Sequence, residues 1–213
     1  LKEIDGFKDT GHKIDEKAFH PKNILEAFNK KLGSKNTTVV TDVGQHQMWT
    51  AQYWQFEEGR SYITSGGLGT MGFGLGGAIG TKLGTPEKNV LLVTGDGSFK
   101  MNCNELATVA TQNLPIVILL FNNNALGMVR QWQNLFSDKR YSETDIYDKT
   151  DYIMLANAYG IEGHKAQNLD ELNEILGSLI LDKPVFVECK IDHDINVFPI
   201  VPPNDNLLNL ICN

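Results

Sequence analysis

The sequence predicts an α/β fold: a three-layer sandwich with a six-stranded, mainly parallel sheet and helices on both faces. Short β-branched runs alternate with longer amphipathic segments along the chain, the pattern of repeated strand and helix units. Two of the runs, 90–93 and 116–120, are apolar at consecutive positions, as expected where helices cover both faces of a strand. These two strands are therefore predicted at the centre of the sheet.

Six segments in all are strand candidates. In chain order, they are 37–42, 61–65, 89–94, 116–121, 160–165 and 185–190. Pro21 suits the first position of a helix that runs to residue 32, because its fixed φ fits that site and its missing N–H would be unbonded there.

Two further helix starts are indicated by capping patterns. Asn102 with Glu105, and Asn168 with Glu171, have the spacing of a capping side chain followed by a carboxylate. The helices predicted from them lie near 102–112 and 169–181.

Composition predicts where the remaining segments lack regular structure and where the domain begins and ends. Segment 137–149 is polar and charged without an apolar period, which predicts a surface loop. The tail after Ile191 contains three prolines and is not expected to form regular structure. We expect one domain over 20–195, preceded by a lead-in from another domain at 1–19 and followed by a tail at 196–213. The absence of an initial Met suggests a piece of a longer protein.

Composition excludes several classes of function. The 213 residues carry a net charge of −7 and no Lys/Arg-rich run, so a nucleic-acid partner is not expected. The three cysteines form no C-x-x-C pair, which favours a reducing, cytoplasmic location and argues against structural zinc. Segment 61–81 is uncharged but is built mainly from Gly, Ser and Thr, so no membrane span is expected.

Three loops that follow predicted strands carry groups suited to phosphate or metal. The first contains G-x-G-x-x-G at Gly67, Gly69 and Gly72, with Asp96 24 positions later. This is the outline of a dinucleotide-binding fingerprint. On this loop alone, a nicotinamide or flavin enzyme remains an open interpretation.

The second and third loops favour a different ligand. Asp96 stands between Gly95 and Gly97, a setting in which backbone N–H groups can approach a phosphate. Asn123 follows the next strand, 27 positions later, so adjacent strands bring both side chains to one edge of the sheet. Mg²⁺ commonly takes one or two carboxylates and completes its six oxygens with phosphate and water. A neutral amide beside Asp96 avoids repulsion against a diphosphate.

These residues resemble a known family. Gly95-Asp96-Gly97 followed by Asn122-Asn123 is similar to the thiamine diphosphate-binding motif. Segments 41–49 (Thr-Asp-Val-Gly-Gln-His-Gln-Met-Trp), 64–72 and 126–133 resemble acetohydroxyacid synthase, the acetolactate synthase large subunit. The resemblance runs from about residue 37 into the tail and covers the diphosphate-binding third of that enzyme.

The resemblance implies roles for individual residues. Asp96 and Asn123 would hold Mg²⁺ through their side chains, and Ala125 through its carbonyl. Met71 would support the bent cofactor, whose aminopyrimidine donates to the Gly69 carbonyl. The cofactor contacts that it implies as a set are Gln45, His46, Gly69, Thr70, Met71, Gly95, Asp96, Gly97, Ser98, Asn123, Ala125, Leu126, Gly127 and Met128. Met128 and Trp132 would line the pocket for the second 2-ketoacid.

The implied reaction is a two-carbon transfer: pyruvate loses CO₂ and condenses with a second pyruvate or with 2-oxobutyrate, in branched-chain amino acid biosynthesis. In this family an activating glutamate lies in an N-terminal domain, usually of the partner subunit, and nothing here corresponds to it. The isolated chain is therefore expected to be inactive. A homodimer or homotetramer is implied; a regulatory small subunit and FAD, bound mainly by other domains, are compatible with the family.

Other interpretations stay open. Pyruvate oxidase, glyoxylate carboligase and catabolic acetolactate synthase also use thiamine diphosphate, and segment 45–49 with Trp132 favours the biosynthetic enzyme by resemblance alone. A Rossmann-type oxidoreductase would not need Asn123. A non-catalytic interaction module would use Trp49, Trp54 and Phe56 for assembly. One departure from the family is Asn204, where its members have Gly.

Overall fold

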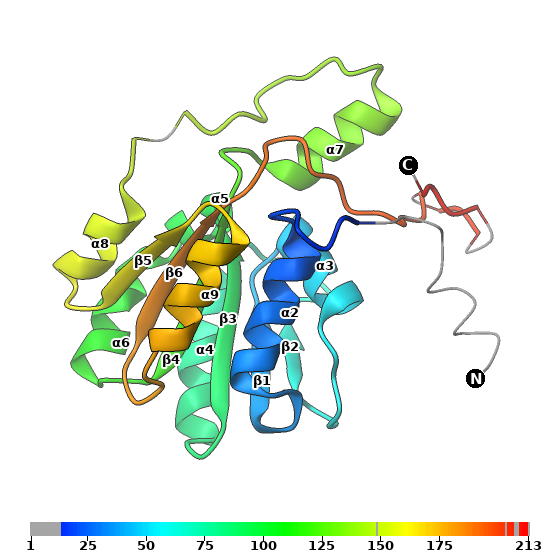
Figure 1. The fold of residues 1–213 in the computed structure, drawn as a ribbon. Helices are drawn as coiled ribbons and strands as arrows, with labels where there is room; N and C mark the ends of the chain where they lie inside the picture. Colours follow the sequence, from blue (N-terminus) through cyan, green and yellow to red (C-terminus); the bar gives the residue numbers. More distant parts are fainter. Residues whose placement is uncertain (1–13, 148, 203, 207–208, 213) are drawn as a thin grey trace.

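The computed structural model describes residues 14–147, 149–202, 204–206 and 209–212. Within them the chain forms a sheet in the order β2-β1-β3-β4-β6-β5, in which every neighbouring pair is parallel (Figure 1). The strands are β1 (Thr37–Thr41), β2 (Tyr62–Thr64), β3 (Asn89–Gly95), β4 (Ile116–Asn122), β5 (Glu162–Ala166) and β6 (Val185–Lys190). All six predicted strands are confirmed, and the sheet is wholly rather than mainly parallel.

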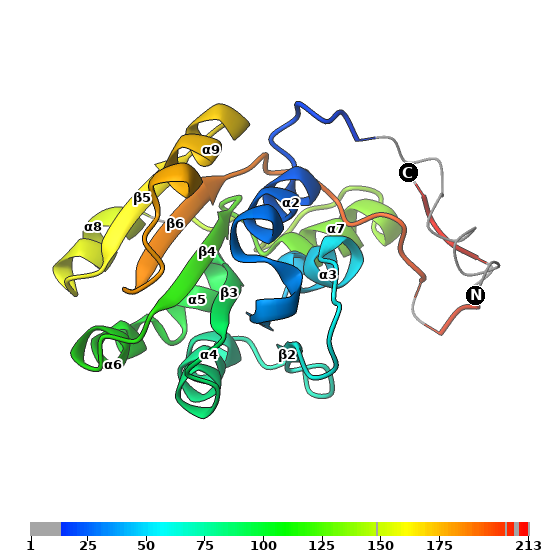
Figure 2. The same ribbon diagram turned by 60° about the horizontal axis from the view of Figure 1, so that its bottom comes forward.

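Helices cover both faces of the sheet, as predicted. Those that belong to the layers or to the site are α2 (Pro21–Leu32), α3 (Gln45–Tyr53), α4 (Phe73–Gly84), α5 (Asp96–Lys100), α6 (Leu106–Thr111), α7 (Gly127–Phe136), α8 (Tyr152–Ala158) and α9 (Leu169–Ser178). Two 3₁₀ turns are η1 (Ser34–Asn36) and η2 (Cys103–Glu105). Figure 2 shows α2, α3 and α9 on one face, and α4, α5, α6 and α8 on the other.

The core consists of two apolar clusters, one on each face of the sheet. Successive residues of a strand point to opposite faces, so Leu91 joins Trp49 of α3 whereas Leu92 joins Phe99 of α5. β4 is buried at every position, and β3 at all positions but its first. The two continuous apolar runs are therefore the central strands, as predicted.

The predicted helix starts are confirmed at two of three places. α2 begins at Pro21. At the start of α9, Asn168 Oδ1 accepts from the N–H of Glu171 (2.9 Å), and Glu171 Oε2 accepts from the N–H of Gln167 (2.8 Å). Together they satisfy N–H groups that the helix itself leaves unbonded.

The capping prediction at Asn102 is wrong. Its side chain caps no helix and instead donates through Nδ2 to the carbonyl of Gly72 (2.9 Å). The chain first forms the turn η2, and α6 starts at Leu106. A contact with a distant loop thus replaces the local capping bond, and it holds that loop in place.

The segments predicted as irregular contain no helix or strand in their described residues. Arg130 of α7 forms ion pairs with both segments. Its Nε lies 2.7 Å from Asp194 Oδ1 in the segment after β6, and its Nη1 lies 3.2 Å from Asp145 Oδ1 in the loop after α7. The guanidinium also lies over the ring of Tyr141, 3.9 Å from its centroid. The loop after α7 and the segment after β6 are therefore both attached to this helix.

The tail has little regular structure among its described residues. It contains one isolated antiparallel bridge, between Ile200 and Ile211. Asn204 adopts a positive φ of 61°, a conformation that Gly adopts freely and Asn tolerates, so the departure from the family is compatible with this backbone. The predicted lead-in 1–19 lies outside the described residues as far as residue 13, and the proposed domain limits stay a prediction. No helix in the described parts of the chain has the length and apolar character needed to cross a bilayer.

The topology creates a crevice between β1 and β3. α3, which follows β1, packs on one face of the sheet, and α5, which follows β3, packs on the other. The loops that leave these two adjacent strands therefore diverge. In open parallel sheets, ligands bind at such a point beyond the carboxyl ends of the strands.

Candidate functional site

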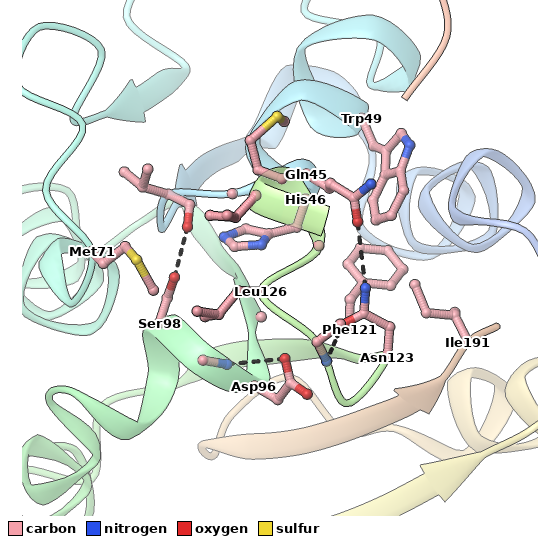
Figure 3. A pocket seen from close by; sticks show the side chains of 18 residues that line it. Gln45, His46, Trp49, Met71, Asp96, Ser98, Phe121, Asn123, Leu126 and Ile191 are labelled. Carbon is pink, nitrogen blue, oxygen red and sulfur yellow. Dashed lines mark hydrogen bonds between the residues drawn. The ribbon is translucent and has the colours of Figure 1, made fainter. Parts of the chain in front are cut away.

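A cavity of about 540 Å³, which includes space open to solvent, lies at this crevice and is lined in part by the first turn of α7 (Figure 3). Most of its lining residues follow β1, β3 and β4, whereas Met71 comes from the loop after β2 and Ile191 follows β6. The predicted site residues that line it are Gln45, His46, Met71, Gly95, Asp96, Gly97, Ser98, Asn123, Ala125, Leu126, Gly127 and Met128. The fold thus gathers groups from four segments, after β1, β2, β3 and β4, that are far apart in the sequence.

Asp96 contributes a buried carboxylate to the cavity. Its Oδ1 accepts from the N–H of Gly97 (2.9 Å), whereas its buried Oδ2 has no hydrogen-bond partner among the described residues. Burial raises the pKa of Asp96 from 3.8 to about 6, although the N–H groups of Gly97 and Asn124 and the charges of Lys100 and Lys190 oppose this change. At neutral pH the group is therefore ionised, with one oxygen still able to accept a ligand.

Asn123 lies at the same edge of the sheet, because β3 and β4 are neighbours and Gly95 pairs with Phe121. Its Oδ1 accepts from the N–H of Ala125 (3.1 Å), and its Nδ2 donates to Gln45 Oε1 (3.4 Å). Asp96 and Asn123 thus line one cavity, as the spacing predicted.

Two helices begin at the cavity with no side-chain cap. The residues before the first turns of α3 and α7 are Gly44, which has no side chain, and Leu126, whose side chain is apolar, so neither can cap a free N–H group. Uncapped helix starts present N–H donors and a partial positive charge, which favour an anion. The carboxylate of Asp96 lies beside them, an arrangement that a cation bridging the carboxylate to an anionic ligand would satisfy.

His46 is enclosed by backbone. A Cβ at Gly95 would lie 2.8 Å from its Nδ1, and a Cβ at Gly44 would lie 2.9 Å from its Cε1. Burial lowers the pKa of His46 to about 3, so the ring is neutral. Its buried Nε2 finds no partner in the part of the chain that the structure describes. The imidazole is thus held rigidly, with one polar atom unsatisfied.

The position of Met71 depends on a carboxylate that the sequence did not single out. Asp42 accepts from the N–H groups of Gly72 (2.8 Å) and Gly74 (3.2 Å), and Asn102 holds the Gly72 carbonyl. Burial raises the pKa of Asp42 in spite of these bonds. Gly72 has a φ of 90°, which suits glycine. These contacts fix the end of the glycine loop and so place Met71 at the cavity.

Three predicted site residues do not line the cavity. Gly69 and Thr70 are exposed on the loop after β2, and Trp132 lies against Phe136 with ring centroids 5.0 Å apart. The loop follows β2, an edge strand, and although its Met71 lines the cavity, the three glycines of the G-x-G-x-x-G pattern do not, as a dinucleotide fingerprint at the crevice would require. This geometry disfavours the Rossmann interpretation.

The structure also adds residues that sequence reasoning missed. The cavity is lined in addition by Val43, Gly44, Trp49, Phe121, Val129 and Ile191. Most are apolar residues in or beside regular elements, and no local signal distinguishes such a residue at a cavity from one in the core. Gln131, a buried amide of α7, was missed as well.

Comparison with known proteins agrees with this site. Residues 42–189 match the family "Thiamine pyrophosphate enzyme, C-terminal TPP binding domain". The chain is 46% identical to the probable acetolactate synthase large subunit of Methanococcus aeolicus over 89% of this chain and 32% of that protein. It is 48% identical to the acetolactate synthase isozyme 2 large subunit of Escherichia coli (strain K12), over 86% of this chain and 35% of that protein.

A third relative is the mitochondrial acetolactate synthase catalytic subunit of Saccharomyces cerevisiae, 40% identical over 88% of this chain and 28% of that protein. The chain spans about one third of the length of the curated relatives it matches. It belongs to the family of C-terminal TPP-binding domains of thiamine pyrophosphate enzymes, and within that family it is similar to acetolactate synthase large subunits.

Proposed function

We propose that this chain binds thiamine diphosphate with Mg²⁺ in the cavity described above, as part of an acetolactate synthase. The reaction proposed for the whole protein condenses pyruvate with pyruvate or 2-oxobutyrate and releases CO₂. The observation that carries the proposal is the unpaired, buried oxygen of Asp96, which lies at the same cavity as Asn123 and the uncapped starts of α3 and α7.

The donors at the cavity fit Mg²⁺. Asp96 offers one charged oxygen, Asn123 an amide oxygen and Ala125 a carbonyl, and Mg²⁺ prefers oxygen ligands. Among the described residues no three His, Cys, Asp or Glu side chains gather to hold a metal. A cation bound here therefore needs further oxygens, which a diphosphate and water supply.

The N–H groups near the cavity fit the diphosphate. Gln45 Nε2 already donates to Gln131 Oε1 (2.9 Å) and to the carbonyl of Ile195 (3.0 Å). The donor that Gln45 offers is thus its backbone N–H at the start of α3. Ser98 likewise uses its hydroxyl to donate to the Val43 carbonyl (2.7 Å), so it too would bind through its backbone N–H.

When bound, thiamine diphosphate supplies the electron sink that decarboxylation of a 2-ketoacid requires. The residues of this chain bind and orient it. Met71, on its anchored loop, and the apolar side chains of Leu126 and Met128 line the cavity and would shield the bound cofactor from water. Contacts from Gly69 and Thr70 to the cofactor, and from Trp132 to the second ketoacid, belong to the proposal for the whole protein.

Several features of the whole protein remain proposals. The activating glutamate, FAD, a regulatory small subunit and a homodimer or homotetramer all involve parts beyond this chain. The isolated chain is therefore expected to form no acetolactate, and its formation would refute this. A cytoplasmic location is also a proposal. The relatives do not decide it, since the one from Saccharomyces cerevisiae is named as mitochondrial.

The binding proposal is tested by titrating the purified chain with thiamine diphosphate while following tryptophan fluorescence, since Trp49 lines the cavity. Binding is expected only with Mg²⁺ and should be lost in Asp96→Ala. Asp182→Ala, at an exposed position, serves as the matched control. Binding of NADH in place of thiamine diphosphate, or binding that persists in EDTA, would contradict the proposal.

A further inference from the structure

Gln131 is a buried amide on α7, with an exposed fraction of 1%. It pairs with both polar groups of one backbone residue: its Nε2 donates to the Val197 carbonyl (2.9 Å), and its Oε1 accepts from the Val197 N–H (2.8 Å). Turning the amide over would set donor against donor and acceptor against acceptor. The tail backbone therefore fixes which end of this side chain is the oxygen.

The orientation of Gln131 determines that of Gln45. Gln131 Oε1 also accepts from Gln45 Nε2 (2.9 Å), and the same nitrogen donates to the Ile195 carbonyl (3.0 Å). With its nitrogen engaged twice, Gln45 presents its oxygen to Asn123. Asn123 Nδ2 lies 3.4 Å from that oxygen.

We infer that Gln131 is a positioning residue for the metal site, acting through Gln45 on Asn123. The inference rests on the proposed function, in which Asn123 Oδ1 binds Mg²⁺. The series Val197 backbone, Gln131, Gln45 and Asn123 is called the amide relay below. Each of the two glutamines has its direction set by the member before it. At Asn123 the relay acts together with the Ala125 N–H, which donates to Asn123 Oδ1 (3.1 Å), to fix which end of this side chain is the nitrogen and which is the oxygen.

The backbone of Gly127 gives a second indication that α7 is packed against Gln45 and Asn123. A Cβ at this position would collide with Gln45 Oε1 and would lie 2.8 Å from Asn123 Nδ2. The first turn of α7 is thus packed directly on the last link of the relay. In the orientations that Gln45 and Asn123 adopt here, a larger residue at position 127 would have to displace both side chains.

The same helix offers a matched control. Gln133 makes an equivalent pair with one backbone residue: its Nε2 donates to the Ser142 carbonyl (3.1 Å), and its Oε1 accepts from the Ser142 N–H (2.8 Å). Unlike Gln131, Gln133 bonds only to an exposed loop and does not lead to Gln45. Gln131→Met and Gln133→Met therefore remove the same kind of contact from one helix, and only the first removes the relay.

The test measures Mg²⁺ affinity of the chain at saturating thiamine diphosphate, with thermal unfolding recorded in parallel. Gln131→Met is expected to weaken Mg²⁺ binding about tenfold or more, the loss typical when a group that orients a ligand is removed. Gln133→Met is expected to leave it unchanged. A Gln131→Met chain that loses thermal stability and keeps its Mg²⁺ affinity would overturn the inference, because Gln131 would then serve the fold alone.

A measurement on the unsubstituted, ligand-free chain covers the case in which Gln131→Met does not fold. NMR detects coupling through a hydrogen bond, here from the Gln45 side-chain nitrogen to the side-chain carbonyl carbon of Gln131. Its presence is expected, and its absence would refute the relay. This result does not depend on the cofactor, whereas failure of the unsubstituted chain to bind Mg²⁺ and thiamine diphosphate would refute the proposed function instead.

Discussion

Replacing Asp96 by Asn should make the metal-free chain more stable, although it removes the proposed Mg²⁺ ligand. Asp96 has an exposed fraction of 2%, and its pKa rises from 3.8 to about 6 in the folded chain. The folded chain therefore holds this proton more tightly than the unfolded chain does. Protonated Asp96 therefore contributes its full share of folding stability below about pH 4. This share is lost as the pH rises through 6 and the folded chain ionises.

The difference between the pKa of 3.8 and the pKa of about 6 in the folded chain sets the size of the effect. It corresponds to about 3 kcal/mol of folding stability lost at neutral pH. Asn keeps an oxygen to accept from the Gly97 N–H, but it adds an amide nitrogen that needs a partner, which offsets about 1 to 2 kcal/mol. The net gain from Asp96→Asn is then about 1 to 2 kcal/mol at pH 7.5. For a chain of this size, it raises the unfolding temperature by about 2 to 8 °C.

The assay is thermal unfolding followed by circular dichroism in EDTA, at pH 7.5 and at pH 4.0. Asp182→Asn, at an exposed site, controls for the general effect of removing one negative charge. The gain should be present at pH 7.5 and absent at pH 4.0. With Mg²⁺ and thiamine diphosphate added, the order should reverse, because ligand binding stabilises only the chain that retains the carboxylate. A loss of stability at pH 7.5 without metal, or an equal gain at both pH values, would refute the reasoning.

Three other substitutions test the fold. Gly76→Ala, at an exposed position of α4 where a Cβ meets nothing within 4 Å, should stabilise the chain by about 0.5 to 1 kcal/mol in urea unfolding; a loss would show that the position is crowded. Asp42→Ala should accelerate hydrogen exchange at the Gly72 and Gly74 amides about thirtyfold, equivalent to about 2 kcal/mol, and unchanged exchange would mean that Asp42 does not anchor the loop. Asn168→Ala should cost about 1 kcal/mol by calorimetry, and no change would count against its role as a cap.

The sequence predicted best where a single local property decides the structure. The boundaries of β3 and β4 differ from the predicted ones by one residue, because a continuous apolar run has no other stable environment. β5 was placed two residues early, at Gly160, whose φ of 80° marks the turn after α8. At Asn102 the cap spacing was present, but a tertiary bond to the Gly72 carbonyl took the side chain instead.

The site was predictable to the extent that topology alone brings its residues together. Asp96 and Asn123 follow adjacent parallel strands, so their spacing sufficed. Asp42 and Gln131 could not be identified, because their partners are distant loops whose positions depend on the complete fold. The sequence carries no local signal for Gln131, because the residues one turn away on α7 are Gly127, Met128, Asn134 and Leu135, a mixed face.

Arg130 joins parts of the chain that would otherwise be independent. One guanidinium binds Asp194 and Asp145 and stacks on Tyr141, while its helix supplies Met128 to the cavity. Any widening of the cavity entrance at α7 must therefore displace the helix, the loop and the C-terminal segment in concert, or else break a twofold ion pair. A change in the position of α7 would on this basis involve three segments at once rather than one alone.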